Sequence, residues 1–250
     1  MWRNFGHAHY HVATNRTFFE GRQRCLDMGS GSGEFLFMIN ALGGDGIGIE
    51  PDEEYASYCR DTLGLDIRVQ TLEEAKFAPG TFDFIRLSHV LEHMRDPVGS
   101  LKILADWLTD DGVISIEVPN IEAEAHAKLK GRMFHFAHVF NFNPYTLRLA
   151  ANLAGLRELP DSQKRLGKYT FGFFAKGEYD DTMLEKGPAN AVIMREAMAG
   201  HNSRLVPAPR GSSAFARFIQ INRVRIREML AARRFRTHRE IADHFATLLR

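Results

Sequence analysis

Short apolar runs alternate with amphipathic stretches from about residue 23 to residue 176. The apolar runs have the length of buried strands, and the stretches between them carry apolar residues at helical spacing. The predicted strands cover residues 24–28, 46–50, 66–70, 82–88 and 113–118, and the predicted helices cover residues 34–42, 52–63 and 97–108. The turn-forming residues 110–112 are expected to separate the last helix from the last strand. This alternation predicts an α/β fold, in which a parallel sheet carries helices on both faces.

The run from residue 144 to residue 176 follows a different pattern. A helix is predicted near residues 144–154, followed by a short apolar run at 156–159 and an alternating strand at 169–176. The seven residues 161–167 between the last two are too few for the helical crossover that a parallel pair would need. These two strands are therefore predicted to pair antiparallel.

Beyond residue 178 the chain changes character. A mildly helical stretch leads to a segment typical of a linker at residues 205–213 and to a predicted helix at 215–230. A last helix begins with a capping box at residues 237–240. The sequence thus predicts a domain of residues 1–178 and a helical C-terminal extension of residues 179–250.

The net charge of +1 conceals two segments of opposite charge. Residues 201–250 contain eleven arginines, no lysine and three acids, which gives +8, so residues 1–200 carry −7. The arginines alternate with apolar residues, and neither of the last two helical stretches can bury its apolar face alone. We expect these helices to pack on the acidic body of the same subunit, or on that of a second one in a homodimer.

Two further observations bound the class of protein. No apolar stretch approaches the ~18 residues that span a bilayer, and the N-terminus lacks the apolar run of a secretory signal. The two cysteines, Cys25 and Cys59, are too few for a metal cluster or a disulfide scaffold. We expect reduced thiols in a cytoplasmic protein without a membrane span.

The most informative motif follows the first predicted strand, where glycines occupy positions 29, 31 and 33. Glycine lets the backbone approach a ligand closely, and the start of the next helix offers free N–H groups. Seventeen residues after Gly33, the second strand ends in Glu50, whose carboxylate can accept both hydroxyls of a ribose. Strand, glycine loop, helix and terminal acid together predict an adenosine-binding half-site.

The spacing of the glycines selects the kind of adenosine ligand. A dinucleotide fingerprint has glycines at relative positions one, three and six. Here the third glycine stands at position five, and Glu34 occupies position six. A pyrophosphate at this helix start would meet the Glu34 carboxylate, so the loop suits a ligand without phosphate.

These residues resemble the class I S-adenosylmethionine-dependent methyltransferases, above all the group with the ubiquinone-biosynthesis O-methyltransferases and many natural-product and sugar methyltransferases. The matching stretches are residues 26–33, 49–51, 82–85, 91–93, 96–97 and 108–118. The resemblance implies a doubly wound, seven-stranded and mostly parallel sheet with a reversed final strand, the Rossmann-like methyltransferase fold. That arrangement agrees with the antiparallel pair predicted above.

The resemblance also implies where S-adenosyl-L-methionine would bind. Ten positions carry over from the binding site of the family: Asp27, Gly29, Ser30, Gly31, Gly33, Glu50, Pro51, Thr71, Leu72 and Ser88. The glycine loop would line the methionine portion with Asp27 orienting the loop, Glu50 would hold the ribose, and the proline after it would lie beside the adenine. Thr71 and Leu72 stand where many relatives have an acid that faces the adenine amine. Ser88 would lie under the sulfonium methionine.

Three histidines are candidates for a catalytic role: His89, His93 and His138. His89 and His93 follow the fourth predicted strand, at the edge where open parallel sheets bind ligands, although His93 also suits a structural role. His138 lies in an aromatic segment, residues 121–142, that is placed to cover the site as a lid. The histidine-rich residues 7–11 are expected to be flexible and to close over the cofactor. We predict no metal site.

The leading interpretation is a methyltransferase that acts at oxygen on a small-molecule acceptor of the sugar, quinone or natural-product type. If the arginine-rich extension reaches the acceptor pocket, it would favour an anionic acceptor. A first alternative is a methyltransferase for RNA or another polyanion docked by that extension. The interleaved apolar residues argue against nucleic acid, as does the sequence Leu87–Val90, which lacks the Asn/Asp-Pro-Pro-aromatic signature of amino-directed enzymes. A second alternative is a non-catalytic nucleotide-binding or scaffold module.

Overall fold

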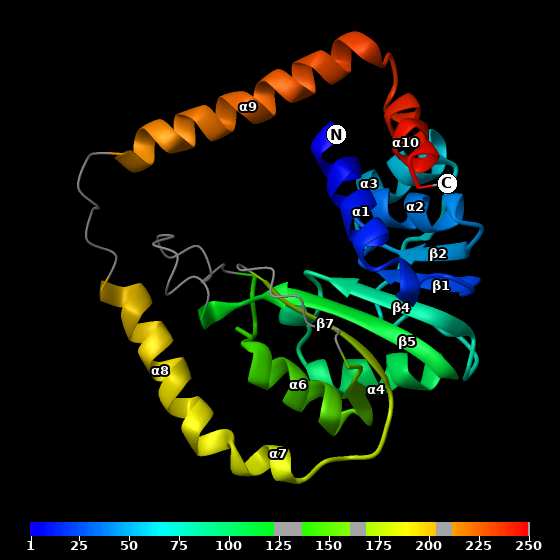
Figure 1. The fold of residues 1–250 in the computed structure, drawn as a ribbon. Helices are drawn as coiled ribbons and strands as arrows, with labels where there is room; N and C mark the ends of the chain where they lie inside the picture. Colours follow the sequence, from blue (N-terminus) through cyan, green and yellow to red (C-terminus); the bar gives the residue numbers. More distant parts are fainter. Residues whose placement is uncertain (123–136, 161–168, 204–211, 250) are drawn as a thin grey trace. The chain divides into compact units, whose positions relative to one another are not determined.

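The computed structural model describes residues 1–122, 137–160, 169–203 and 212–249 (Figure 1). One sheet contains seven strands in the order β3-β2-β1-β4-β5-β7-β6. The strands are β1 (Arg24–Met28), β2 (Asp45–Ile49), β3 (Asp66–Arg68), β4 (Phe82–Ser88), β5 (Leu108–Pro119), β6 (Leu156–Glu158) and β7 (Tyr169–Lys176). The pairs β1–β2, β2–β3 and β4–β5 are parallel, whereas β7 runs antiparallel to β5 and β6. The predicted seven-stranded, mostly parallel sheet with a reversed final strand is confirmed.

Helices occupy the segments between the strands and both ends of the described chain. They are α1 (Trp2–Thr14), α2 (Glu34–Ala41), α3 (Glu53–Tyr58), α4 (Pro97–Trp107), α6 (Pro144–Leu153), α7 (Thr182–Glu185), α8 (Gly187–Ser203), α9 (Ser212–Arg234) and α10 (His238–Thr247). A single π-helical turn, Cys59–Leu63, continues α3. The elements predicted between residues 24 and 176 are confirmed, with a large shift of bounds only at β5.

The predicted start of β5 is wrong. The sequence predicts a break at residues 110–112 and a strand from residue 113, whereas β5 already begins at Leu108, directly after α4. The register between β4 and β5 shifts between Phe82 and Phe84, and the turn-forming residues lie in β5 opposite this shift. A bulge can take up such residues without ending the strand, which the local sequence does not reveal.

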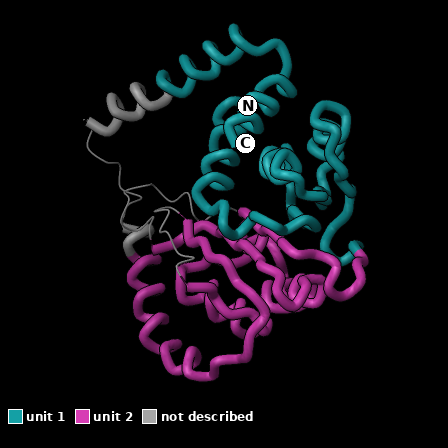
Figure 2. Tube along the Cα trace, turned by 45° about the vertical axis from the view of Figure 1, so that its right-hand side comes forward, with its two compact units in different colours: residues 1–75, 208–250 teal, residues 76–207 magenta. Residues whose placement is uncertain are grey.

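The chain divides into two compact units (Figure 2). Unit 1 comprises residues 1–75 and 208–250, and unit 2 comprises residues 76–207. Unit 1 contains β1 to β3 with α1, α2, α3, α9 and α10, and unit 2 contains β4 to β7 with α4, α6, α7 and α8. The predicted division of the chain after residue 178 stays a prediction.

In unit 1 the first helix is regular from Trp2 onward, so the expectation of a flexible segment at residues 7–11 is wrong. Phe5, Ala8 and Val12 are buried, and their spacing places them on one face of a helix. Within unit 1 this helix contacts α2, α9 and α10. The buried apolar residues, and not the histidines between them, therefore determine how this segment folds.

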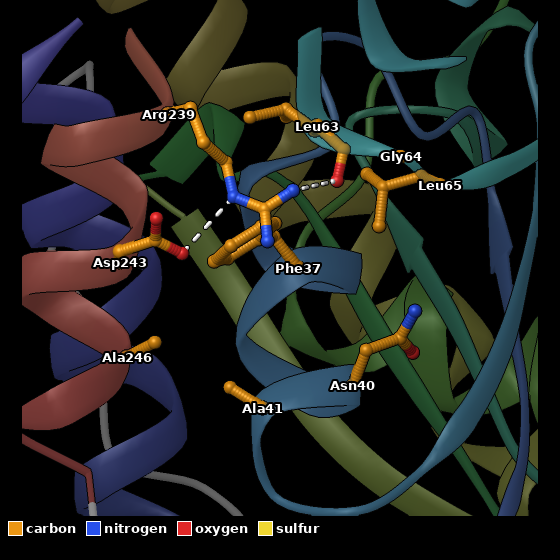
Figure 3. A pocket seen from close by; sticks show the side chains of 9 residues that line it. All are labelled: Phe37, Asn40, Ala41, Leu63, Gly64, Leu65, Arg239, Asp243 and Ala246. Atoms are coloured by element: carbon orange, nitrogen blue, oxygen red, sulfur yellow. Dashed lines mark hydrogen bonds and ion pairs between the residues drawn. The ribbon is translucent and has the colours of Figure 1, made fainter. Parts of the chain in front are cut away.

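The last helix, α10, packs on α1 and α2 (Figure 1). Its apolar residues Ile241, Ala242, Phe245 and Ala246 are buried. Arg239 adds a polar contact that Figure 3 shows, in which the guanidinium lies 5.0 Å from the centre of the Phe37 ring and donates to the Leu63 carbonyl at 3.0 Å. This helix therefore packs on its own chain, and a homodimer through the C-terminal helices stays a prediction.

The described part of α9, residues 222–234, buries much less of its surface. Ala231 is buried, but Ile226, Met229 and Leu230 are each at least half exposed. The arginines of this described part, residues 222–234, are exposed as well. The two C-terminal helices thus differ, because α10 buries an apolar face and α9 leaves apolar side chains on its surface.

Two expectations from composition can be compared with the described residues. Cys25 and Cys59 are both buried and neither forms a disulfide, which agrees with the predicted thiols. No described helix combines the length and the apolar character needed to cross a membrane.

The glycines of β2 let the neighbouring elements lie directly against the strand. A Cβ on Gly46 would lie 2.6 Å from Asn40 Oδ1 and closer still to Leu36, both on α2. A Cβ on Gly48 would lie 2.8 Å from Oγ of Ser30, in the loop after β1. Both distances are shorter than real Cβ contacts, so a side chain at either position would push the helix or the loop away.

We expect Gly46→Ala to lower the free energy of unfolding by about 1–3 kcal/mol, because the added methyl group overpacks the contact between β2 and α2. Urea denaturation followed by circular dichroism measures this change. Gly187→Ala is the matched control, since the nearest atom to its Cβ would be Tyr145 Oη at 3.8 Å. Equal stability of the Gly46 and Gly187 variants would contradict the close packing inferred for β2.

Candidate active site

The loop after β1 takes a backbone conformation that its glycines permit. Gly29, Gly31 and Gly33 have φ angles of +71°, +52° and +75°, in the left-handed region that other residues rarely adopt. The N–H groups of Gly29 and Ser30 donate to the carbonyl of Ile49 at 2.8 and 3.1 Å. The loop is therefore hydrogen-bonded to the last residue of β2.

Glu50, directly after β2, binds the same loop through its side chain. Its Oε2 accepts a hydrogen bond from the Gly31 N–H at 2.7 Å, and its Oε1 accepts one from the Asp52 N–H at 3.0 Å. The glycine loop and the strand-end acid, which the sequence relates only by spacing, are in direct contact. A carboxylate has about four acceptor sites, so Glu50 keeps capacity for ribose hydroxyls.

The loop also offers a polar group and open space to a ligand. Ser30 Oγ is buried and has no hydrogen-bond partner among the described residues. A Cβ on Gly31 would find nothing within 4 Å, so the space beside this residue is open. Glu34 Oε1 accepts from Ser32 Oγ at 2.9 Å, which keeps a carboxylate where a pyrophosphate would bind. These features fit an adenosyl ligand without phosphate.

Cys59, which the sequence does not connect with the loop, contacts it. Its Sγ donates to the Gly31 carbonyl at 3.3 Å. Burial, together with the charges of Glu34, Glu50 and Asp27, raises the pKa of this thiol to about 12. The thiol therefore stays protonated and acts as a hydrogen-bond donor to the loop rather than as a nucleophile.

The remaining predicted cofactor residues of unit 1 lie within β1 and after β2 and β3. Asp27, within β1, is fully buried, and Pro51 is exposed. The Thr71 N–H donates to Glu74 Oε2 at 2.8 Å, and Leu72 is buried. Glu74, the second of two acids after Leu72, thus holds the backbone of Thr71 in the segment after β3.

In unit 2, ionisable side chains gather at the end of β4. Ser88 Oγ donates to Glu117 Oε1 at 3.2 Å. The His89 ring lies between two carboxylates, with Nδ1 3.4 Å from Glu92 Oε1 and Nε2 3.3 Å from Glu117 Oε1. The side chains of Glu92 and Glu117 are 1% and 5% exposed. Glu117 is not among the residues predicted from the sequence, although a lone acid in the apolar strand at residues 113–118 is an informative signal.

His89 has a strained backbone and a charged side chain. Its φ angle of +57° is positive, a conformation that the described residues otherwise show only at glycine. Burial lowers the pKa of His89, but hydrogen bonds to Glu117 and Glu92 and their charges raise it to about 9 on balance. The ring is therefore protonated at neutral pH, which favours a role as a hydrogen-bond donor over the predicted role as a base.

The other two histidine candidates, His93 and His138, lie together. Their ring centroids are 4.9 Å apart, and His93 Nδ1 lies 2.9 Å from the Ala137 carbonyl. The N–H groups of residues 139–140 donate to the carbonyl of Glu92 at 2.9 and 3.1 Å. One ligand atom each of Glu92, His93 and His138 lies within 4.8 Å of the other two, a spacing that a metal ion could bridge. The predicted absence of a metal stays a prediction.

The two ends of the predicted lid, residues 121–142, lie together at the end of β5. The Ile121 N–H donates to the Phe142 carbonyl at 3.0 Å, and Asn120 and Phe142 form an isolated β-bridge. Between these ends, residues 123–136 lie outside the described residues. A long segment whose two ends are joined is typical of a binding loop.

Comparison with known proteins identifies the family. The family described as "Methyltransferase domain" matches residues 5–159, which is more than half of the chain. The chain belongs to this methyltransferase family. A ubiquinone biosynthesis O-methyltransferase from Parvibaculum lavamentivorans is 32% identical over 109 residues, which cover 42% of this chain and 43% of that protein. The chain spans half the length or less of the curated relatives it matches.

Solved structures of methyltransferases share the fold at low sequence identity. A SAM-dependent methyltransferase from Archaeoglobus fulgidus has a TM-score of 0.54 at 17% identity, over 69% of this chain and 94% of that one. The CcbJ methyltransferase from Streptomyces caelestis has a TM-score of 0.57 at 13% identity, over 68% of this chain and 89% of that one. The predicted family and its Rossmann-like fold are thus confirmed for this methyltransferase.

We expect the imidazole of His89 to titrate near pH 9, and Glu117→Gln to bring its pKa down toward the ordinary value near 6.5. Because the folded-state pKa is raised, the stabilisation is fully present below about pH 6.5 and is lost as the pH rises through about 9. NMR of the imidazole nitrogens measures the pKa, and thermal unfolding at both pH values measures the loss. A wild-type pKa near 6.5, or an equal loss in His89→Gln, would contradict the inferred ion pairs.

Proposed function

We propose that the chain transfers a methyl group from S-adenosyl-L-methionine to an oxygen of a small-molecule acceptor. The observation that carries this proposal is the 2.7 Å hydrogen bond between the Gly31 N–H and Glu50 Oε2. It joins the glycine loop and the strand-end acid in one adenosine-binding arrangement, within a chain of the methyltransferase family. Glu34 disfavours a phosphate at the same helix start, which argues against a dinucleotide.

S-Adenosyl-L-methionine, when bound, supplies an electrophilic methyl group on a sulfonium that already contains a good leaving group. Glu50 accepts hydrogen bonds from the ribose hydroxyls. Ser30 Oγ, which lacks a partner among the described residues, and the loop N–H groups bind polar atoms of the methionine portion. Leu72 and Pro51 border the adenine. The chain's main task is then to hold an acceptor oxygen about 3 Å from the methyl carbon and in line with the bond that breaks.

The cluster at the end of β4 orients that acceptor. The protonated His89 donates a hydrogen bond, while Ser88 and Glu117 fix the position of the ring. As the new C–O bond forms, the hydroxyl proton leaves to a base. His138 is the proposed base, and His93, whose ring lies beside it, holds it in place.

Methylation at oxygen is supported by the relatives whose names state that chemistry, the ubiquinone biosynthesis O-methyltransferases of Parvibaculum lavamentivorans and Xanthomonas campestris. The match covers less than half of this chain and less than half of those proteins, so their acceptor does not carry over. An anionic acceptor and a homodimer stay predictions, as does a location in the cytoplasm.

A second candidate, a methyltransferase for a polyanion, is favoured by the surface of α9. Five exposed arginines have no acidic partner within the part of the chain that the structure describes: Arg223, Arg225, Arg227, Arg233 and Arg234. The exposed Ile226, Met229 and Leu230 between them do not suit a phosphate backbone, so we prefer the small-molecule acceptor. RNA binding by the full chain with a steep dependence on salt would favour the second candidate.

Glu50→Gln is expected to weaken S-adenosylmethionine binding by about 1.5–3 kcal/mol, because a charged acceptor of the ribose hydroxyls is lost. Glu53→Gln, which removes an exposed carboxylate paired with Arg60, is the control and should bind like the wild type. Isothermal titration calorimetry measures both affinities. If the two variants bind equally well, Glu50 does not hold the ribose.

Gly31→Val is expected to abolish cofactor binding while the chain stays folded, because the branched side chain would fill the open space beside the loop. Gly80→Val is the matched control, since Gly80 also has a positive φ, +66°, and open surroundings. Calorimetry with S-adenosylmethionine and circular dichroism separate loss of binding from loss of fold. Retained binding in Gly31→Val would contradict the position proposed for the cofactor.

If His138 is the base, activity should rise through about pH 6–7, and His138→Ala should lower turnover about a hundredfold while the cofactor dissociation constant stays within a few-fold. Because His89 is already protonated there, His89→Gln should lower turnover without removing this pH dependence. Mass spectrometry of S-adenosylhomocysteine formed with a panel of hydroxylated acceptors measures both effects. A flat pH profile with full activity in His138→Ala would instead indicate catalysis by positioning alone.

A further inference from the structure

The first turn of α1 is capped by a residue from the C-terminal extension. The carboxylate of Glu228, on α9, accepts hydrogen bonds from the N–H groups of Trp2 at 3.2 Å and Arg3 at 2.9 Å. The first N–H groups of a helix have no partner within it, and α1 has no side-chain cap of its own. These bonds, with the nearby ammonium of Met1, lower the pKa of Glu228 although burial raises it. The carboxylate is therefore charged when it caps the helix.

Aromatic contacts hold the same turn. The Trp2 ring lies 5.6 Å from the Phe235 ring and 4.5 Å from the Phe245 ring, measured between centroids. The next turns of α1 are held differently, because Phe5 is fully buried and packs edge-on against Phe37 of α2. The first turn of α1 thus receives both its cap and its aromatic contacts from the C-terminal extension.

The same turn contacts Glu34, the first residue of α2 directly after the glycine loop. Asn4 Nδ2 donates to Glu34 Oε1 at 3.2 Å, and the same oxygen accepts from Ser32 Oγ at 2.9 Å. Ser32 and Glu34 stand on either side of Gly33, the last glycine of the loop. A continuous series of contacts therefore runs within unit 1 from Glu228 through the first turn of α1 to the predicted cofactor loop.

We propose that Glu228 is a positioning residue for cofactor binding, which it supports by fixing Asn4 against Glu34, the residue that also accepts a hydrogen bond from Ser32. This inference rests on the proposed function, since it assigns a role at the same cofactor site. When the cap is lost, the first turn of α1 frays part of the time, and Glu34 then lacks one of its two donors. An affinity falls in proportion to the fraction of molecules in the binding-competent state. The arginine-rich extension is then part of the cofactor site through its one acid on α9.

The first measurement is the exposure of Trp2 in the full chain. Trp107→Phe leaves Trp2 as the only tryptophan. In that background, Glu228→Ala is expected to raise acrylamide quenching of its fluorescence about twofold or more. Glu196→Ala, which removes an exposed glutamate from α8, is the matched control and should leave quenching unchanged. Equal quenching in the two variants would overturn the role of Glu228 as a cap.

The second measurement is the affinity for S-adenosylmethionine, by calorimetry on the full chain. We expect the dissociation constant to rise about threefold to tenfold in Glu228→Ala and less in Glu228→Gln, which keeps one acceptor oxygen. Asn4→Ala should produce a similar rise. If the coupling passes through Asn4, the double variant should bind no more weakly than the weaker single variant.

The outcomes separate this inference from the proposed function. A wild-type chain that does not bind S-adenosylmethionine would contradict the proposed function, whereas the quenching experiment would still decide whether Glu228 caps α1. Wild-type binding with an unchanged dissociation constant in Glu228→Ala would overturn the positioning role. Additive effects of Glu228→Ala and Asn4→Ala would overturn the route through Asn4.

Discussion

The hydrogen bond between Gly31 and Glu50 is the contact on which the rest of the proposed cofactor site depends. A loop with three left-handed glycines exposes backbone N–H and carbonyl groups that need partners. The end of β2 supplies acceptors for the N–H groups, namely the carbonyl of Ile49 and the carboxylate of Glu50. The Cys59 thiol donates to the Gly31 carbonyl. Gly48 lets the loop come this close to the strand. The same acid that suits a ribose thus also keeps the loop in place before any ligand binds.

Much of the fold could be predicted because its signals are local. The strands at residues 24–28 and 82–88 have the predicted bounds, since each is a short apolar run that ends where the polarity changes. The pairing of the glycine loop with Glu50 could also be predicted, because adjacent parallel strands end at one edge. The start of β5 at Leu108 could not, since the register of β4 with β5, and not the local sequence, decides whether turn residues end a strand.

The charge state of a candidate residue was harder to predict than its place in the fold. His89 directly follows the end of β4, as predicted, but its protonation state depends on Glu117, which comes from β5, the neighbouring strand in the sheet. Burial alone would have lowered its pKa and made the ring a neutral base. Two nearly buried carboxylates reverse that effect and leave a cation. The functional role of a histidine therefore follows from its charged neighbours, which sequence spacing does not identify.

The C-terminal extension shows that composition does not determine what a residue does. Arg239 packs its guanidinium on Phe37 and bonds to a backbone carbonyl, so this arginine contributes to the core of unit 1. The arginines of the described part of α9 remain exposed, whereas Glu228 on the same helix caps α1. A charge of +8 over residues 201–250 suggests a single basic surface, but the contacts divide it. One helix completes the hydrophobic packing, while the other contributes mainly through its only acid.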